Sequence, residues 1–403
     1  MPLKRLFFLL LAACGSCAPA KPVPAIPAGG HQLRVVGYLA SWGVRSKGTR
    51  IADLPAKDLT HIFYAFGRID SAGRVVLGDP CLDAGVCAAG QTAPPGGNFA
   101  ELGRLKANNP HLKLVVSIGG WSGSGRFSDA ALTDSSRRLF AESAIDVFIR
   151  RTHGLFDGID LDWEFPVSGG PETNVRRPAD KENLTLLLAE IRRQLDAAGT
   201  NDKRHYELAI AASANPKALA NLEVGRIEPL LDFINVMTYD YYAGSRRTGF
   251  NSPLYAAVGE ASPSFNIDAS MRAFLDAGVP ATKLLVGIPF YGRAYGGVAS
   301  VNNGLFQPVG GPPPGWRGGD GDWKVLAQTR LRDPRFVRHW EPSARVPFLY
   351  DSTSGTWVSY DDPQSVSEKV RYVRERGLGG VMIWELGGDD GSLMRAISGR
   401  SAP

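Results

Sequence analysis

Three acidic residues at alternate positions, Asp160, Asp162 and Glu164, are the strongest chemical feature of the sequence. Successive side chains of a β-strand point to opposite faces, so a strand over residues 158–164 places these carboxyl groups in one row. Carboxyl groups this close cannot all ionise at low cost, so at least one pKa should rise and leave a protonated acid near neutral pH. The alternative is an edge strand with a solvated acidic face, which the apolar and β-branched residues of the run disfavour. The row therefore predicts general acid–base catalysis.

Short apolar runs alternate with longer amphipathic stretches along the chain, which is the pattern of βα units. The candidate strands are residues 33–39, 59–66, 112–118, 158–163, 207–212, 233–238, 284–289 and 380–384. Helical periodicity is clearest over residues 134–153, over 179–198 with an end before Gly199, and over 363–376 with an end at Gly377. Eight strands with intervening helices predict an α/β fold, a (β/α)8 TIM barrel, whose chemistry lies in loops at the strand C-terminal ends.

One segment, residues 296–347, interrupts this alternation after the seventh strand. It contains a run of Gly and Pro over residues 310–315 and several dispersed aromatic residues, and it is too long for an ordinary βα loop. We expect a small inserted α+β lobe within a single catalytic barrel domain that covers residues 31–398.

The N-terminal residues read as an export signal. Lys4 and Arg5 precede an apolar run over residues 6–13 that is too short to span a bilayer, so we expect a signal peptide over residues 1–13. The run ends in Leu-Ala-Ala-Cys, which resembles a bacterial lipobox, in which Cys14 becomes the lipidated first residue. An ordinary secretory cleavage near residues 18–20 is the alternative. Residues 14–30, rich in Pro, Ala and Gly, suit a tether, so we expect an exported protein, lipid-anchored in the bacterial cell envelope or secreted.

Composition and charge exclude several other classes of protein. Hydrophobic residues at 44% and charged residues at 21% are near the globular average, which excludes a disordered chain, a coiled coil and a polytopic membrane protein. The net charge of +5 comes from interspersed residues without a basic run, so no nucleic-acid partner is expected. We expect a monomer whose membrane contact is limited to the possible lipid anchor.

The cysteines and histidines predict a disulfide and no metal site. Cys14 and Cys17 fall in the leader and tether, whereas Cys81 and Cys87 enclose five residues of a loop-like stretch and form the natural disulfide of an exported protein. The six His residues are dispersed and no C-x-x-C pair occurs beyond the leader and tether, where Cys14 and Cys17 lie, so a zinc site is not supported.

The acidic run resembles the D-x-x-D-x-D-x-E signature of glycoside hydrolase family 18, the chitinases and their relatives, and matches it at Asp157, Asp160, Asp162 and Glu164. Further motifs follow the order of that family: Gly37-Tyr38, Ser117-Ile118-Gly119-Gly120-Trp121, Met237-Thr238-Tyr239-Asp240, Pro289-Phe290-Tyr291-Gly292-Arg293 and Met382-Ile383-Trp384-Glu385. Each motif lies at the C-terminal end of a predicted strand. The resemblance implies catalysis without a metal or a cofactor.

The resemblance also implies a retaining, substrate-assisted reaction, an exception to the usual glycosidase with two catalytic carboxyl groups. Glu164 would be the general acid and later the base. Asp162 would hold the N–H of the substrate's 2-acetamido group, and Asp160 would share a proton with Asp162. Tyr239 would donate to the acetamido oxygen.

Other positions are implied to bind the sugar or to support the site. The substrate-binding set is Tyr38, Phe66, Ser117, Trp121, Asp240, Arg293 and Trp384. Within it, Trp384 would form an apolar floor, and Tyr38 and Ser117 would donate to Asp160. Asp157 is out of phase with the acidic row and is expected to be structural. The resemblance further implies cis peptide bonds at Ala65-Phe66, Glu164-Phe165 and Trp384-Glu385.

One departure from the family pattern concerns the leaving side of the cleft. Relatives often carry Gly-x-Trp after the Tyr-Asp pair, whereas residues 241–246 of this chain read Tyr-Tyr-Ala-Gly-Ser-Arg, which places Arg246 near the position of that stacking Trp.

The resemblance predicts a hydrolase of β-1,4-linked N-acetylglucosamine chains, in chitin or chito-oligosaccharides. An endo-β-N-acetylglucosaminidase acting on glycoprotein or cell-wall glycans uses the same core and is the alternative. A non-catalytic chitin-binding lectin on this fold is a second alternative, which the presence of Glu164 disfavours.

Overall fold

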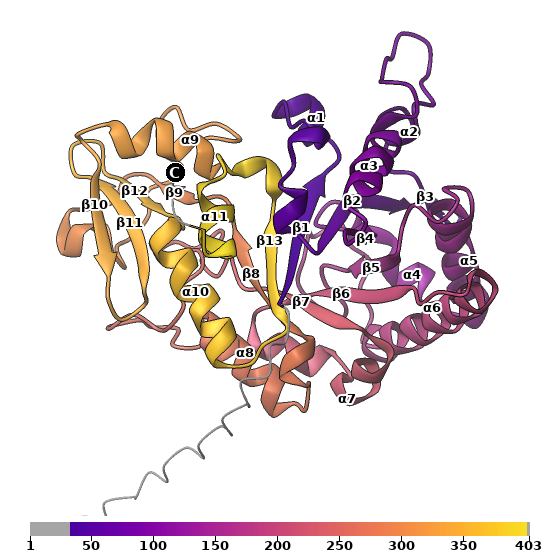
Figure 1. Cartoon of the computed structure of the whole chain (residues 1–403). Coiled ribbons are helices and arrows are strands. Elements are labelled where there is room, and N and C mark those ends of the chain that lie inside the picture. Colours follow the sequence, from indigo (N-terminus) through magenta and orange to yellow (C-terminus); the bar gives the residue numbers. More distant parts are fainter. Residues whose placement is uncertain (1–32, 401–403) are drawn as a thin grey trace, which may run out of the picture. The chain divides into compact units, whose positions relative to one another are not determined.

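Eight parallel strands close into a barrel in the computed structural model, which describes residues 33–400 (Figure 1). In barrel order the strands are β1 (Arg34–Ala40), β2 (His61–Ile69), β4 (Lys113–Gly119), β5 (Gly158–Asp162), β6 (Glu207–Ser213), β7 (Phe233–Met237), β8 (Leu284–Pro289) and β13 (Gly380–Trp384). β13 pairs with β1, which closes the barrel. The short strand β3 (Val75–Val76) adds antiparallel to the end of β2. The predicted TIM barrel is confirmed.

Helices follow the strands as the βα pattern predicts. They are α1 (Gly43–Ser46), α2 (Pro80–Ala84), α3 (Gly97–Asn108), α4 (Phe127–Ala130), α5 (Asp134–Ile145), α6 (Asp180–Asp202), α7 (Val224–Ile227), α8 (Ile267–Asp276), α9 (Trp323–Gln328), α10 (Pro363–Glu375) and α11 (Ser392–Ser398). Thr133 and Asp362 begin α5 and α10 with capping boxes, in which each cap residue and a serine three positions on bond each other's backbone N–H. These local signals explain why both helix starts are predictable.

Two helix ends differ from the prediction. α6 continues through Gly199 to Asp202 and ends at Lys203, which has a left-handed φ of 55°. A Cβ atom at position 199 would lie 2.3 Å from the carbonyl oxygen of Arg204, so Gly199 allows the returning chain to approach closely and does not end the helix. After α5 the chain widens into a π-helical turn over Asp146–Arg150.

The strands carry two separate apolar layers. Their outward residues pack against the helices in a large core, whereas the inward residues form a smaller cluster inside the barrel. The buried inward residues are Val36, Tyr38, Phe63, Ala65, Val115, Ala209, Phe233, Leu285 and Met382. Phe66, Met237, Tyr239 and Trp384 pack on this cluster and are only partly buried. Phe66, Met237 and Trp384 lie in the C-terminal halves of their strands and Tyr239 lies just after β7, at the end where barrel chemistry is expected.

The inserted lobe contains a four-stranded antiparallel sheet in the order β10 (Val337–Glu341), β11 (Val346–Asp351), β12 (Thr356–Ser359) and β9 (Arg293–Tyr295). In Figure 1 these strands, in orange, lie to one side of the barrel strands. The sheet runs from 293 to 359 and so extends beyond both limits of the predicted segment 296–347. At the C-terminal limit the cause is the hairpin of β11 and β12, whose buried strand residues continue past position 347 and which turns at Gly355, with a left-handed φ of 63°. An aromatic cluster that includes Phe348 and Trp357 gives the lobe its own core.

The predicted disulfide is present: Cys81 and Cys87 are bonded, with their Cα atoms 4.2 Å apart. Asp79 caps the adjoining helix α2 by accepting from the backbone N–H groups of Cys81 and Leu82. No helix among residues 33–400 is long and apolar enough to cross a membrane. The signal peptide over 1–13, the tether over 14–30 and Cys14 lie outside the described residues.

Candidate active site

The acidic row lies on the inner face of β5, as its two-residue period predicts. Asp160 and Asp162 are buried inside the barrel, and Glu164 follows at the end of the strand. The intervening residues Leu161 and Trp163 belong to the outer core, so β5 separates an acidic face from an apolar one.

Asp160 is the deepest carboxyl group of the row. One of its oxygens, Oδ2, accepts hydrogen bonds from the Tyr38 hydroxyl at 2.8 Å and from the Ser117 hydroxyl at 2.7 Å. Burial raises the pKa of Asp160 to about 6, although these hydrogen bonds and Asn235 act in the opposite direction. Tyr38 and Ser117 therefore lie where the resemblance implies, and Asn235, which also donates to the Tyr38 hydroxyl, is a neighbour that no motif marks.

The pKa values of Asp162 and Glu164 are both raised by burial and by neighbouring negative charges. Burial raises the pKa of Asp162 well above its ordinary value, and the nearby charges of Glu164 and Asp160 raise it further. Burial and then the charge of Asp240 raise the pKa of Glu164 to about 7. A carboxyl group with this pKa can both donate and accept a proton near neutral pH, which general acid–base catalysis requires.

The backbone of Glu164 is held from two sides. Its N–H donates to the Ser124 hydroxyl at 2.9 Å, and its carbonyl oxygen accepts from the Asn174 amide at 2.8 Å. The chain after β4 also passes very close, because a Cβ atom at Gly119 would lie 2.3 Å from the carbonyl oxygen of Asp162. Gly119 has a φ of 114°, so both the conformation and the space at this motif position require glycine.

Tyr239 and Asp240 reach the row from the loop after β7. Burial and the charges of Asp162 and Glu164 raise the pKa of Tyr239 well above its ordinary value, so its hydroxyl stays a hydrogen-bond donor. Asp240 has a left-handed φ of 61° and accepts from the Tyr291 hydroxyl at 2.7 Å and from Arg293 Nε at 2.8 Å. Tyr291 stands in the motif over residues 289–293, but the sequence predicts no function for it.

Aromatic rings line the open end of the barrel beside these groups. The rings of Phe66 and Trp384 stack with centroids 5.7 Å apart, and Trp384 also packs against Tyr38 at 5.5 Å. Trp42 packs on the Phe66 ring, and its side chain is 44% exposed. Trp121 is 58% exposed. Exposed aromatic faces of this kind can pack on the apolar faces of sugar rings. Trp42 was missed, although its position just after β1 could have marked it.

The predicted cis peptide bonds at Ala65-Phe66, Glu164-Phe165 and Trp384-Glu385 are all present. Glu385, directly after the third of these bonds, receives a hydrogen bond from Lys47 at 2.7 Å, and the same ammonium group contacts Asp322 of the inserted lobe at 2.9 Å. Lys47 therefore links the loop after β1, the end of β13 and the lobe.

Asp157 lies at the other end of β5. It forms ion pairs with Lys106 at 2.6 Å and with Arg204, and it accepts from the backbone N–H of Leu114 at 2.7 Å. None of these partners belongs to the acidic row.

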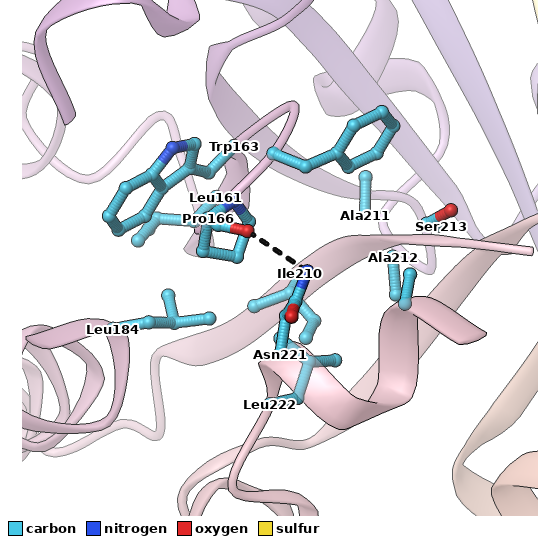
Figure 2. A pocket seen from close by; sticks show the side chains of 12 residues that line it. Leu161, Trp163, Pro166, Leu184, Ile210, Ala211, Ala212, Ser213, Asn221 and Leu222 are labelled. Atoms are coloured by element: carbon cyan, nitrogen blue, oxygen red, sulfur yellow. Dashed lines mark hydrogen bonds between the residues drawn. The ribbon is translucent and has the colours of Figure 1, made fainter. Parts of the chain in front are cut away.

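A small apolar cavity adjoins the outer face of β5 (Figure 2). Trp163 and Pro166 lie around it with Leu184 of α6, and the Asn221 amide contacts the carbonyl oxygen of Pro166 at 3.5 Å. The acidic residues point to the opposite face of the strand, so this cavity is separate from the carboxyl groups that could do chemistry.

The segment after Asp240 joins the lobe. The backbone N–H of Val309 donates to the carbonyl oxygen of Arg246 at 2.9 Å, and the Arg246 side chain is exposed. Within residues 33–400, no group of three or more His, Cys, Asp or Glu side chains is arranged to hold a metal ion.

The family model described as glycosyl hydrolases family 18 matches residues 34–389 of the chain. The chain belongs to glycoside hydrolase family 18. It is a chitinase-type glycosidase of that family. Chitinase A1 of Niallia circulans is 41% identical over 408 residues, and the match covers 91% of this chain and 58% of that relative. The chain thus spans little more than half of the length of chitinase A1.

Solved structures agree with the family 18 fold. Chitinase ChiA74 from Bacillus thuringiensis matches with a TM-score of 0.83 at 34% identity, covering 91% of this chain and 69% of that chain. A family 18 N-acetylglucosaminidase from Paenibacillus barengoltzii matches with a TM-score of 0.78 at 35% identity, covering 91% of this chain and 99% of that chain.

Proposed function

We propose that this family 18 chain hydrolyses β-1,4 linkages of chitin or chito-oligosaccharides with retention, by substrate-assisted catalysis. The observation that carries the proposal is the pairing of Glu164, whose pKa is raised to about 7, with the buried Asp162 two residues before it. Tyr239 lies near enough to both for their charges to raise its own pKa. A general acid, Glu164, and two groups that can bind an acetamido substituent, Asp162 and Tyr239, therefore face the same space.

In the first step, Glu164 gives its proton to the glycosidic oxygen while the bond from this oxygen to the anomeric carbon breaks. The oxygen of the substrate's own 2-acetamido group attacks the anomeric carbon and forms an oxazolinium ion. Asp162 accepts from the acetamido N–H, and its negative charge stabilises the cation. The Tyr239 hydroxyl donates to the acetamido oxygen and holds it in the attacking position.

In the second step, the Glu164 carboxylate accepts a proton from water as the water oxygen attacks the anomeric carbon. The carbon–oxygen bond of the oxazolinium ring breaks, the acetamido group is restored, and Glu164 regains its proton. Two displacements at one carbon return the original configuration. Asp160 shares a proton with Asp162 over this cycle, supported by its bonds from Tyr38 and Ser117.

The other predicted contacts complete the proposed binding site. Trp384, stacked on Phe66, forms the floor under the reacting sugar, and Asp240 and Arg293 form a polar wall. The exposed rings of Trp121 and Trp42 supply surfaces for neighbouring sugars.

Glu164→Gln tests the general acid. We expect kcat to fall by at least ~10²- to 10⁴-fold, because the amide cannot protonate the leaving oxygen, whereas the Kd of a chito-oligosaccharide should change little. Isothermal titration and turnover on the same oligosaccharide measure both quantities. Turnover near the parental value would remove Glu164 from this role.

Asp162→Ala tests substrate assistance. The variant should lose affinity for a thiazoline mimic of the oxazolinium ion far more than for an intact oligosaccharide, because only the mimic resembles the charged ring. Fully deacetylated oligomers should not be cleaved by the parent enzyme, since they lack the attacking oxygen. A covalent sugar adduct on a carboxylate of the chain would contradict the mechanism.

A second candidate is an endo-β-N-acetylglucosaminidase that acts on glycoprotein or cell-wall glycans. A solved family 18 N-acetylglucosaminidase is about as similar in sequence to this chain as a solved chitinase is, at 35% and 34% identity. Digestion of chito-oligosaccharides beside a glycoprotein glycan, with products identified by mass spectrometry, separates the two. Release of the protein-linked glycan without cleavage of chito-oligosaccharides would favour the second candidate.

We further propose that the enzyme is exported, with Cys14 as a lipid anchor, and that it acts as a monomer without a metal or cofactor. The N-terminal apolar run with its Leu-Ala-Ala-Cys end supports the export and the anchor.

A further inference from the structure

Two buried neighbours, Asn251 and Ser252, hold the peptide units on both sides of Tyr239. The Ser252 hydroxyl donates to the carbonyl oxygen of Thr238 at 2.6 Å, which fixes the peptide unit before Tyr239. The Asn251 side-chain oxygen accepts from the backbone N–H of Asp240 at 3.1 Å, which fixes the unit after it. Asn251 is 2% exposed and Ser252 is fully buried, so both act from behind the tyrosine.

A buried ion pair sets the direction of the Ser252 hydroxyl. Lys369 of α10 donates to both carboxylate oxygens of Asp361 at 2.6 Å and to the Ser252 oxygen at 2.8 Å. An ammonium group has only donors, so Ser252 must accept from Lys369, and its single hydrogen is left for the Thr238 carbonyl. The mechanism uses neither charge. A buried ion pair is weak evidence for stability, and its best-attested use is to specify one arrangement.

The same dipeptide is tied to the point where the lobe returns to the barrel. The backbone N–H of Asn251 donates to the hydroxyl of Ser359, the last residue of β12, at 2.8 Å. Asp361 follows two residues later, just before α10, and also accepts from the Ser365 hydroxyl at 2.7 Å. The lobe sheet and α10 therefore meet the loop of Tyr239 through Asn251 and Ser252.

We propose that Lys369, Asp361 and Ser252 form a positioning network that holds Tyr239 where its hydroxyl can donate to the acetamido oxygen. They are positioning residues, because they act through Tyr239 and do not touch the substrate. The inference rests on the proposed function, since it requires the proposed role of the Tyr239 hydroxyl. A misplacement of about 1 Å can cost about 10²-fold in rate, so release of this network lowers kcat more than it raises KM.

The test measures kcat and KM on one chito-oligosaccharide for the parent, Ser252→Ala, Tyr239→Phe and the double variant. Ser252→Ala keeps the Lys369–Asp361 pair and removes the Ser252 hydroxyl with both of its hydrogen bonds, the one to the Thr238 carbonyl oxygen and the one from Lys369. We expect kcat to fall about tenfold and KM to stay within about twofold. If the network acts through the Tyr239 hydroxyl, the double variant is no slower than Tyr239→Phe alone.

Thr60→Val is the matched control. The Thr60 hydroxyl is also held by the backbone, at 2.9 Å from the Val35 N–H and 3.1 Å from the Val35 carbonyl oxygen, and it contacts His61 Nδ1 at 2.7 Å, but it lies at the opposite end of the barrel. It should lower the melting temperature without lowering kcat. Should Ser252→Ala fail to fold, Lys369→Met combined with Asp361→Asn removes both charges and keeps Ser252, and the same loss of kcat with unchanged KM is expected.

Several outcomes would overturn the inference. Parental kcat in Ser252→Ala, beside a large loss in Tyr239→Phe, overturns the positioning network and leaves the proposed function standing. Parental kcat in Tyr239→Phe removes the proposed role of that hydroxyl, and the inference falls with it. Additive losses in the double variant, or an equal loss in Thr60→Val, show that Ser252 does not act through Tyr239.

Discussion

Burial and the neighbours of each group make the three carboxyl groups of the acidic row chemically different. Asp160 receives two hydroxyl donors, and its pKa is raised only to about 6. Asp162 lies between two other acids, and its pKa is raised well above its ordinary value. The pKa of Glu164, at the open end of the strand, is raised to about 7. The proposed roles of Glu164 as general acid and of Asp162 as the stabilising carboxylate therefore follow from the depth of each group in the barrel and not from its residue type.

The pKa of Glu164 predicts the alkaline limb of the pH profile. Glu164 must be protonated in the first step, so kcat/KM should fall as the pH rises through about 7. The negative charge of Asp240 raises this pKa, because it disfavours a second charge nearby. Asp240→Asn should therefore lower the pKa and move the limb to lower pH, besides lowering the rate.

Initial rates at low substrate concentration, each scaled to its own maximum, measure the position of the limb. Asp320→Asn removes a charge at a partly exposed position of the lobe and serves as the control, with an unchanged limb. A limb that stays in place in Asp240→Asn would contradict the assignment of the titration to Glu164.

The acidic row is predictable from the sequence because strand alternation is a local property. Its partners are not local: Tyr38 donates to Asp160 across 122 residues of chain, and only the family motifs point to such pairs. Asn251 and Lys369 belong to no quoted motif, and their contacts to Ser359 and Ser252 span 108 and 117 residues. Spacing alone cannot reveal contacts that depend on the closed fold.

At the scale of elements, strands are more predictable than the boundaries of helices and the lobe. Buried parallel strands form short apolar runs, and every predicted run is a barrel strand. Glycine is a less certain signal for the end of a helix. Gly377 does follow the end of α10, whereas Gly199 lies inside α6, where it allows Arg204 to approach. One residue type serves both as a terminator and as a close-packing position, and only tertiary contacts separate the two.

A charge network at the N-terminal ends of three strands should stabilise the barrel. Glu207, the first residue of β6, contacts His61 of β2 at 2.9 Å and Lys113 of β4. Burial alone would raise the pKa of Glu207, but the hydrogen bonds and charges of His61 and Lys113 outweigh it and lower the pKa to about 2. A lowered folded-state pKa stabilises the protein above the unfolded pKa, and this contribution is lost as the pH falls towards the folded value.

Glu207→Gln should therefore reduce the free energy of unfolding by about 3 kcal/mol at pH 7, from a pKa lowered from 4.5 to about 2. The difference from the parent should shrink as the pH falls from 4.5 towards 2. Urea unfolding at pH 7 and pH 3 measures it. Glu375→Gln, at an exposed ion pair, is the control and should change stability by less than about 0.5 kcal/mol. A constant difference at both pH values would contradict the linkage.

At the scale of the whole molecule, the two ends of the barrel have different tasks. The C-terminal ends of the strands carry the acidic row, the aromatic rings and the link to the inserted lobe. The N-terminal ends carry the Glu207 network and the entry of the chain, since β1 begins at Arg34. The start of β1 and the acidic row therefore lie at opposite ends of the barrel.

Cys14→Ser tests the proposed lipid anchor on this basis. A serine has no thiol to receive the lipid, so the variant should leave the membrane fraction or stay unprocessed, whereas the parent should partition with membranes. Cys17→Ser is the matched control, because it removes a thiol three residues away and leaves Leu-Ala-Ala-Cys intact. Its membrane fraction should equal that of the parent, and kcat on a soluble chito-oligosaccharide should be the same for all three forms.

Membrane fractionation, together with the mass of the N-terminal residue of the mature chain, measures the outcome. Equal distribution of the parent and Cys14→Ser would contradict the anchor and favour secretion after cleavage near residues 18–20, without affecting the chemistry proposed for Glu164.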